Sequence, residues 1–185
     1  MNKTLTISEP LPAAQDEAGH ATLEELYRRY RAPVQRYLYQ LCGSVELAEE
    51  LTQETFIKAL TGLLAFRGDC SVATWLFSIA RNAYLNSLRR PDPAHVDTDE
   101  FLGIPDSAAY TDPVRRYDAS EQRDMISLAL AQLPERQRSI LLLRDAQDLS
   151  YAEIAAVLGM SLSAVKVNLF RARNAFRAAY DELEA

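Results

Sequence analysis

The feature that most constrains the fold is a pair of helix signals separated by a glycine, in residues 150–177, SYAEIAAVLGMSLSAVKVNLFRARNAFR. Ser150 and Glu153 match a capping box, in which a hydroxyl and a carboxylate each satisfy a free backbone donor at a helix start. Gly159 stands where a positive φ angle would end this short helix, and Ser161 can cap the next one. The spacing predicts a helix-turn-helix with a three-residue turn, 159–161.

The second helix of this motif has two distinct faces. Apolar residues recur at helical spacing and form a stripe suited to burial: Val165, Leu169, Ala172 and Phe176. The opposite face carries Ser163, Val167, Phe170, Arg171 and Asn174, flanked by Lys166 and Arg177. Burial of the stripe would turn this second face toward solvent.

The charge of this helix is one-sided. No Asp or Glu occurs between Ser161 and Tyr180, while four cations do: Lys166, Arg171, Arg173 and Arg177. Such a helix offers partners to phosphates without local repulsion. The alternative is a helical hairpin whose basic face is merely solvated. The capping box, the glycine turn and the acid-free second helix together favour a helix-turn-helix that meets DNA.

Composition predicts an all-α protein. The chain of 185 residues has only 6 Gly, few alternating β-branched runs, and a repeated helical periodicity of Leu, Ala, Glu and Arg. No apolar run reaches the length of a membrane span, so we expect no membrane insertion and a cytoplasmic protein. Cys42, Cys70, His20 and His95 lack metal-ligand spacing, so we expect no disulfide, metal or other cofactor.

The formal net charge of −6 is segregated along the chain. Acids crowd residues 46–54 and again 92–118, whereas residues 70–90 and 161–180 contain none. A chain with this unfavourable long-range field should bind free DNA weakly, yet can still use its local basic faces. A larger partner would have to supply the remaining affinity.

In the first half of the chain, residues 1–21 are predicted to be a disordered tail, and the pattern after them predicts helices. Thr22 and Glu25 form another capping box, and Pro33 inside the following pattern predicts a kink or break. Ser44 can cap a second helix with an acidic face. That face, which includes Glu50 and Glu54, is either simply solvated or a docking surface for a basic partner.

Residues 66–69 interrupt the helices and lead into an acid-free helical stretch, 71–90. Trp75 lies there among cations and amides, which suits unstacked bases, although a lone Trp in a helix also suits a core. Periodicity fails from Pro91 to Ser120, where seven acids and four prolines predict a flexible acidic linker. Two further helices, with Pro134 in the first turn of the second, would brace the helix-turn-helix. We therefore expect two small helical domains, 22–90 and 121–185.

These segments together resemble the extracytoplasmic-function group of bacterial sigma factors, in the sigma-70 family. The resemblance covers residues 23–90 and 121–183. It rests on AEELTQETF at 48–56, FRGD at 66–69, TWLFSIARN at 74–82, LPER at 133–136 and FRAR at 170–173, in this order.

The resemblance implies a promoter-specificity subunit of RNA polymerase that is not an enzyme. It implies core polymerase docking through Glu49, Glu50, Gln53, Glu54 and Phe56. It implies recognition of the minus-ten promoter element through Phe66, Arg67, Trp75, Ile79, Arg81 and Asn82. Among these, Asn82 would line a pocket for a flipped base. It implies recognition of the minus-thirty-five element through Ser163, Lys166, Val167, Phe170, Arg171 and Arg173.

The sequence departs from the family pattern at Lys166-Val167-Asn168, where many members have a basic residue, Ser and Arg. We therefore expect a reduced contribution from Asn168. Expected partners are core RNA polymerase, promoter DNA and a cognate anti-sigma factor, with a monomer when free. The alternative is a stand-alone helix-turn-helix regulator, which should also carry a ligand or receiver domain, and residues 23–90 resemble neither.

Overall fold

The computed structural model describes residues 22–89 and 113–185, with residues 113–121 described only as helical backbone. Within these ranges every regular element is helical, which confirms the all-α prediction. The elements are α1 (Leu23–Cys42), α2 (Val45–Leu63), α3 (Val72–Ser87), α4 (Pro113–Ala131), α5 (Glu135–Leu141), the π-helical turn η1 (Leu142–Ala146), α6 (Tyr151–Leu158) and α7 (Leu162–Glu184). The predicted tail, 1–21, and linker residues 91–112 lie outside the described residues.

Polar side chains start the helices where the sequence predicts them. Both capping boxes are present, from Thr22 to Glu25 on α1 and from Ser150 to Glu153 on α6. The Ser161 hydroxyl accepts a hydrogen bond from the Ala164 amide at the start of α7. Gly159 ends α6 at φ 61°, a left-handed conformation that a residue with a Cβ atom adopts only at a cost. The predicted turn, 159–161, is therefore confirmed.

Proline positions account for three differences from the predictions. Helix α1 runs through Pro33 without a break, because Pro33 is buried and the packed residues on both sides hold the helix together. Helix α4 begins at Pro113, inside the segment predicted as linker, since proline suits the first helical turn. Pro134 is the N-cap residue of α5 rather than part of its first turn.

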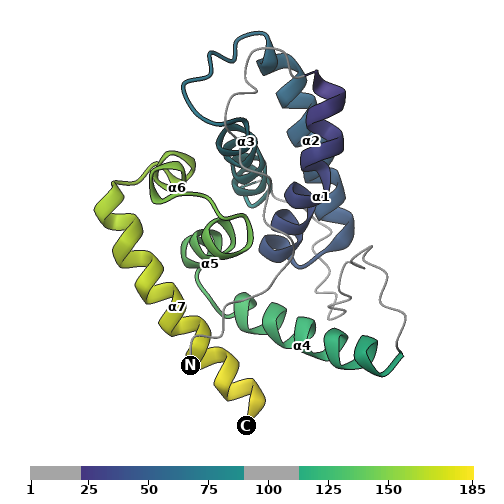
Figure 1. The fold of residues 1–185 in the computed structure, drawn as a ribbon, viewed down its shortest axis with the longest axis vertical. Coiled ribbons are helices and arrows are strands. Elements are labelled where there is room, and N and C mark those ends of the chain that lie inside the picture. Colours follow the sequence, from purple (N-terminus) through teal and green to yellow (C-terminus); the bar gives the residue numbers. More distant parts are fainter. Residues whose placement is uncertain (1–21, 90–112) are drawn as a thin grey trace.

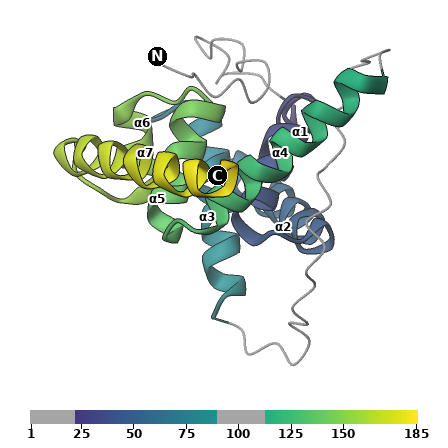
Figure 2. The same ribbon diagram turned by 90° about the horizontal axis from the view of Figure 1, so that it is seen from below.

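The helices form two units that lie against each other (Figure 1). Helices α1–α3 form the N-terminal unit, 22–89, and the elements from α4 to α7 form the C-terminal unit, 113–185. Helix α4 lies along one end of the molecule, where it contacts both α7 and α1 (Figure 2). Buried side chains of both units belong to one continuous apolar core. The predicted separate domains are thus packed together.

No single helix in residues 22–89 and 113–185 is long and apolar enough to cross a membrane. Helices α6 and α7, which are bent by 97° at their turn, satisfy that length and composition test only when they are taken together.

Candidate functional site

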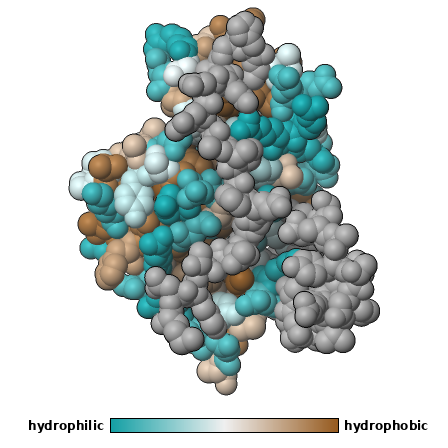
Figure 3. Space-filling view, in the orientation of Figure 1, coloured by the Kyte–Doolittle hydropathy of each residue, from teal (hydrophilic) through white to brown (hydrophobic). Residues whose placement is uncertain are grey.

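Helix α7 presents the face that the sequence predicts for DNA. Val165, Leu169 and Ala172 are buried, while Phe176 is partly buried, so the predicted stripe packs into the core. All the members of the opposite face are exposed: Ser163, Lys166, Val167, Phe170, Arg171 and Asn174. Apolar side chains gather over the first turns of α7 in the space-filling view (Figure 3). Phe170 is 68% exposed and Val167 50%, so this face is both basic and apolar.

Two predicted contributors on α7 are engaged within the protein. The Arg173 guanidinium donates to both carboxylate oxygens of Asp145 in η1, at 2.6 and 3.3 Å. That hydrogen bond to Asp145 raises the pKa of Arg173 above its ordinary value. The Asn168 amide donates to the Ala164 carbonyl at 2.8 Å and is half-buried. Arg173 therefore braces α7 against η1, and Asn168 turns back onto its own helix.

Helix α2 carries the acidic face predicted as a docking surface. Glu49, Glu50 and Gln53 are exposed, and Glu54 is half-buried with its carboxylate 2.6 Å from the Lys58 ammonium. Phe56, which was grouped with these residues, is only 5% exposed. Its ring packs edge-on against Tyr27 of α1 with 4.9 Å between ring centroids. Phe56 is therefore covered in this arrangement, because the helix turns this position toward α1, and its part in polymerase docking stays a prediction.

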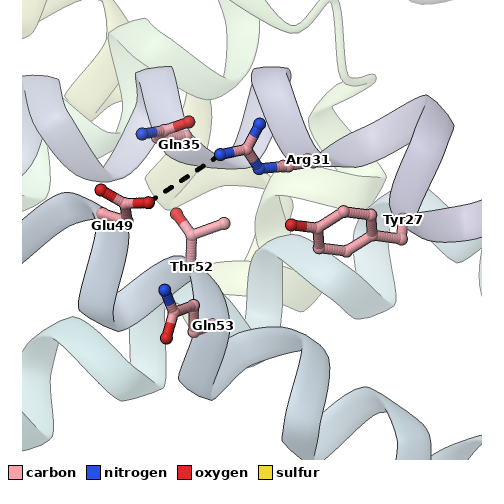
Figure 4. A pocket seen from close by; sticks show the side chains of 6 residues that line it. All are labelled: Tyr27, Arg31, Gln35, Glu49, Thr52 and Gln53. Atoms are coloured by element: carbon pink, nitrogen blue, oxygen red, sulfur yellow. Dashed lines mark ion pairs between the residues drawn. The ribbon is translucent and has the colours of Figure 1, made fainter.

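A small pocket adjoins the acidic face, between α1 and α2 (Figure 4). It is lined by Tyr27, Arg31, Gln35, Glu49, Thr52 and Gln53. The Arg31 guanidinium reaches across it to the Glu49 carboxylate at 4.0 Å and also lies over the Tyr27 ring. Sequence reasoning missed Tyr27 and Arg31. Their spacing of four residues on α1, beside the apolar stripe, is the signal that could have identified them.

The predicted minus-ten residues that belong to α3 divide between two faces of this helix. Trp75, Ile79 and Asn82 follow one another at helical spacing, and Asn82 is exposed. The Trp75 ring packs against Phe66 with centroids 4.8 Å apart. It also lies over Gly62, where an added Cβ would come to 3.0 Å from Trp75 Cζ2, so a larger residue there would require the ring to shift by a few tenths of an ångström.

The remaining cations of this group have partners within the chain. Arg67 is exposed and forms an ion pair with Asp69 at 3.0 Å. Arg81 is buried, and its guanidinium donates to both carboxylate oxygens of Glu135 in α5, at 3.2 Å each. Arg81 is therefore covered in this arrangement, because α3 packs against the C-terminal unit, and its assignment to the minus-ten element stays a prediction.

A second carboxylate of the C-terminal unit reaches the start of α3. Glu153 Oε1 accepts hydrogen bonds from the Ser71 hydroxyl at 2.7 Å and the Thr74 hydroxyl at 3.1 Å. Its other oxygen completes the capping box of α6 with Ser150. Burial raises the pKa of Glu153, but the hydrogen bonds from Ser71, Ser150 and Thr74 outweigh it and hold the pKa below its ordinary value. The sequence marked Glu153 only as a cap, and nothing local indicated its contact with α3.

Further polar contacts join the two units. The Ser139 hydroxyl donates to Glu135 and therefore accepts from the buried Tyr37 hydroxyl, at 3.1 Å. The Arg138 guanidinium donates to the Leu41 carbonyl at 2.8 Å, and Gln40 donates to Ser127 at 3.1 Å. The two units are thus joined by side-chain hydrogen bonds as well as by their shared apolar core.

Two family models match the chain. One, described as Sigma-70 region 2, matches residues 26–92, and the other, described as Sigma-70, region 4, matches residues 123–176. RNA polymerase sigma factor YlaC of Bacillus subtilis is 37% identical over 155 residues, which cover 82% of this chain and 88% of that protein. The ECF RNA polymerase sigma-E factor of Escherichia coli is 36% identical over 133 residues, 68% of this chain and 70% of that protein.

Solved structures share the fold. The sigma factor RpoE of Bartonella quintana, in complex with the anti-sigma factor NepR, aligns with a TM-score of 0.70 at 23% identity, over 85% of this chain and 96% of that one. CnrH, in complex with the cytosolic domain of CnrY, aligns with a TM-score of 0.63 at 22% identity, over 86% of this chain and 88% of that one.

Proposed function

This chain belongs to the sigma-70 family as an extracytoplasmic-function RNA polymerase sigma factor, and on that premise we propose which of its surfaces perform each step. Its function is to direct core RNA polymerase to specific promoters and to assist promoter opening. The region 2 match over residues 26–92 disfavours a stand-alone helix-turn-helix regulator.

Residues 22–90 act as the docking and minus-ten unit. Core polymerase docks on the acidic face of α2, through Glu49, Glu50, Gln53 and Glu54. The observation that supports this is that the acidic face of α2, beside the pocket between α1 and α2, is exposed. Phe56 supports this surface from beneath by holding Tyr27.

The two promoter elements are read by different helices. Trp75, Ile79 and Asn82 of α3 hold the unstacked bases of the minus-ten element, with Phe66 behind Trp75. The unit 121–185 reads the minus-thirty-five element through the exposed face of α7, above all Lys166, Val167, Phe170 and Arg171. The basic and apolar character of that face suits phosphates together with thymine methyl groups.

The proposed partners are core RNA polymerase, promoter DNA and a cognate anti-sigma factor. The structural relatives bound to NepR and to CnrY support the last of these. The free protein is a monomer that works in the cytoplasm with polymerase, requires no cofactor and catalyses no reaction itself.

A charge reversal on α2 tests the docking surface. The variant Glu50→Lys with Glu54→Lys should lose association with core polymerase in a pull-down, and with it promoter-dependent transcription. The matched control is Glu182→Lys with Glu184→Lys, which makes the same charge change at exposed positions of α7. Unchanged core binding by the α2 variant, with its helical content intact, would refute the docking assignment.

A further inference from the structure

The middle of the exposed face of α7 is apolar. Val167 is 50% exposed and Phe170 is 68% exposed. Ser163 lies one helical turn before Val167 and Arg171 one turn after it, so Val167 occupies the centre of this face. Lys166 and Arg171 are exposed beside it and have no ion-pair partner among the side chains that the structure describes. An uncovered apolar centre with free cations around it is complementary to a polyanion that also presents apolar groups.

The chemistry of valine limits what this centre can recognise in DNA. The side chain has no hydrogen-bonding group, and branching at Cβ holds it in one preferred rotamer in a helix. Among the base edges of the major groove, thymine alone presents an apolar group, its C5 methyl group. At the same place cytosine presents an amino group nearby, which would lose water to the valine without gaining a partner. A valine placed against the base edges therefore favours thymine.

We propose that Val167 is a specificity-determining residue of α7 and selects one thymine of the minus-thirty-five element through its C5 methyl group. Phe170 lies one turn further along the helix and shields this contact from water. The proposal rests on the proposed function, because it requires α7 in the major groove of this element. It goes further in naming the base, and the group on that base, that a single residue recognises.

The contact distinguishes this chain from the family pattern, in which many members have serine where Val167 stands. A serine hydroxyl both donates and accepts hydrogen bonds, so it can serve more than one base. Valine loses that versatility and places two methyl groups at a half-exposed position. Recognition at this position therefore changes from a hydrogen bond to an apolar contact.

The test uses the full chain in complex with core polymerase and DNA duplexes randomised over the minus-thirty-five element. Selection of bound duplexes gives the preferred bases, and the best duplex is remade with deoxyuridine in place of one thymidine at a time. Deoxyuridine pairs like thymidine and lacks only the C5 methyl group. At one position its introduction should weaken binding about three- to fivefold, the effect expected for one methyl group removed from water.

Variants of Val167 connect this effect to the side chain. Val167→Ala and Val167→Ser should bind the thymidine and deoxyuridine duplexes equally at that position. The site is half-exposed and alanine favours helix, so α7 should persist in Val167→Ala, as judged by circular dichroism. The matched control is Val45→Ala, which truncates a valine that is 37% exposed on α2 and should retain the difference.

Cytosine and 5-methylcytosine at the same position separate the methyl group from the base pair. The native chain should bind the duplex with 5-methylcytosine about three- to fivefold more tightly than the one with cytosine, because the added methyl group lies where that of thymine does. Val167→Ala should not distinguish these two duplexes.

Equal binding of the thymidine and deoxyuridine duplexes at every position would overturn the proposal. A methyl dependence that Val167→Ala retains would also overturn it and would assign the contact to another residue. Neither result touches the proposed function, because the native chain would still bind core polymerase and transcribe from the selected duplex. A chain that never binds core polymerase would refute the proposed function, and the same duplexes offered to the chain alone would still test Val167.

Discussion

Helices α3 and α7 each carry basic and amide side chains in an acid-free stretch, yet the structure treats the two helices differently. On α7, Lys166, Phe170 and Arg171 extend into solvent. On α3, Arg81 is buried against Glu135, and the start of the helix is held by Glu153. The DNA-binding face proposed for α7 is therefore open, whereas the side of α3 that carries Arg81 is covered.

The difference shows that the tertiary environment decides what an arginine does. Arg81 contributes to the cohesion of the two units, because its charge-assisted hydrogen bonds are sheltered from water. Arg171 lies among exposed neighbours and has little to stabilise within the chain. We therefore expect Arg171 to be free for DNA in the closed chain, whereas Arg81 must first leave Glu135.

The sharpest test of this comparison exchanges each arginine for glutamine. Arg81→Gln should lower the free energy of unfolding by about 1 to 3 kcal/mol, because it leaves the Glu135 carboxylate without its cation. Arg171→Gln should change it by less than about 0.5 kcal/mol, as exposed substitutions usually do. Denaturant unfolding of both variants measures this. Equal losses would show that Arg81 contributes no more to the stability of the folded chain than Arg171 does.

The exposed face of α7 can be tested on promoter templates. Arg171→Ala and Lys166→Ala polymerase complexes should be compared on matched and mutated minus-thirty-five elements over a range of salt. A base-reading side chain should lose about 1 to 3 kcal/mol of discrimination, whereas a phosphate contact weakens all templates alike and lowers the salt slope by about one. If neither variant changes the ratio between the templates, the sequence is read through DNA shape or by neighbouring residues.

The asparagines of the two helices extend the comparison. Asn82 is exposed, so Asn82→Ala should reduce transcription from a duplex template by a factor that corresponds to about 1 kcal/mol of lost binding free energy. A template already opened at the minus-ten element should partly restore transcription by this variant. Asn168 already donates to Ala164, so Asn168→Ala should have a much smaller effect on promoter use. Equal losses for Asn82→Ala on duplex and pre-opened templates would refute the base-pocket assignment.

The smallest expected effect is the pH dependence of the stability that Glu153 provides through its contact with α3. The pKa of Glu153 is lower in the folded chain than its ordinary value, so its contribution to stability is present at neutral pH and is lost as the pH falls through the folded pKa. The free energy of unfolding of the native chain should exceed that of Glu153→Gln at pH 7 by about 1 kcal/mol or less. This difference should shrink at about pH 3. A difference that is independent of pH would mean that the negative charge of Glu153 does not stabilise the folded chain.

Sequence reasoning identified the local elements of this fold. Capping serines, the glycine turn and the stripe through Val165 and Leu169 were readable because each depends on residues within a few positions of one another. The family motifs placed the acidic face of α2 and the exposed face of α7 by the same short-range logic. Helix-break predictions failed at Pro33 and Pro113, because each proline is compatible with helix in its context.

The contacts between the units depend on the tertiary structure alone. Arg81 and Glu135 are 54 positions apart, and Ser71 and Glu153 are 82 apart, so no periodicity or spacing links them. The sequence determined that α3 would be an acid-free helix and that Glu153 would cap α6. Only the packing of α3 against α5 and α6 decided that the same carboxylate also holds α3, because a hydrogen bond requires proximity in space and chain order does not encode it.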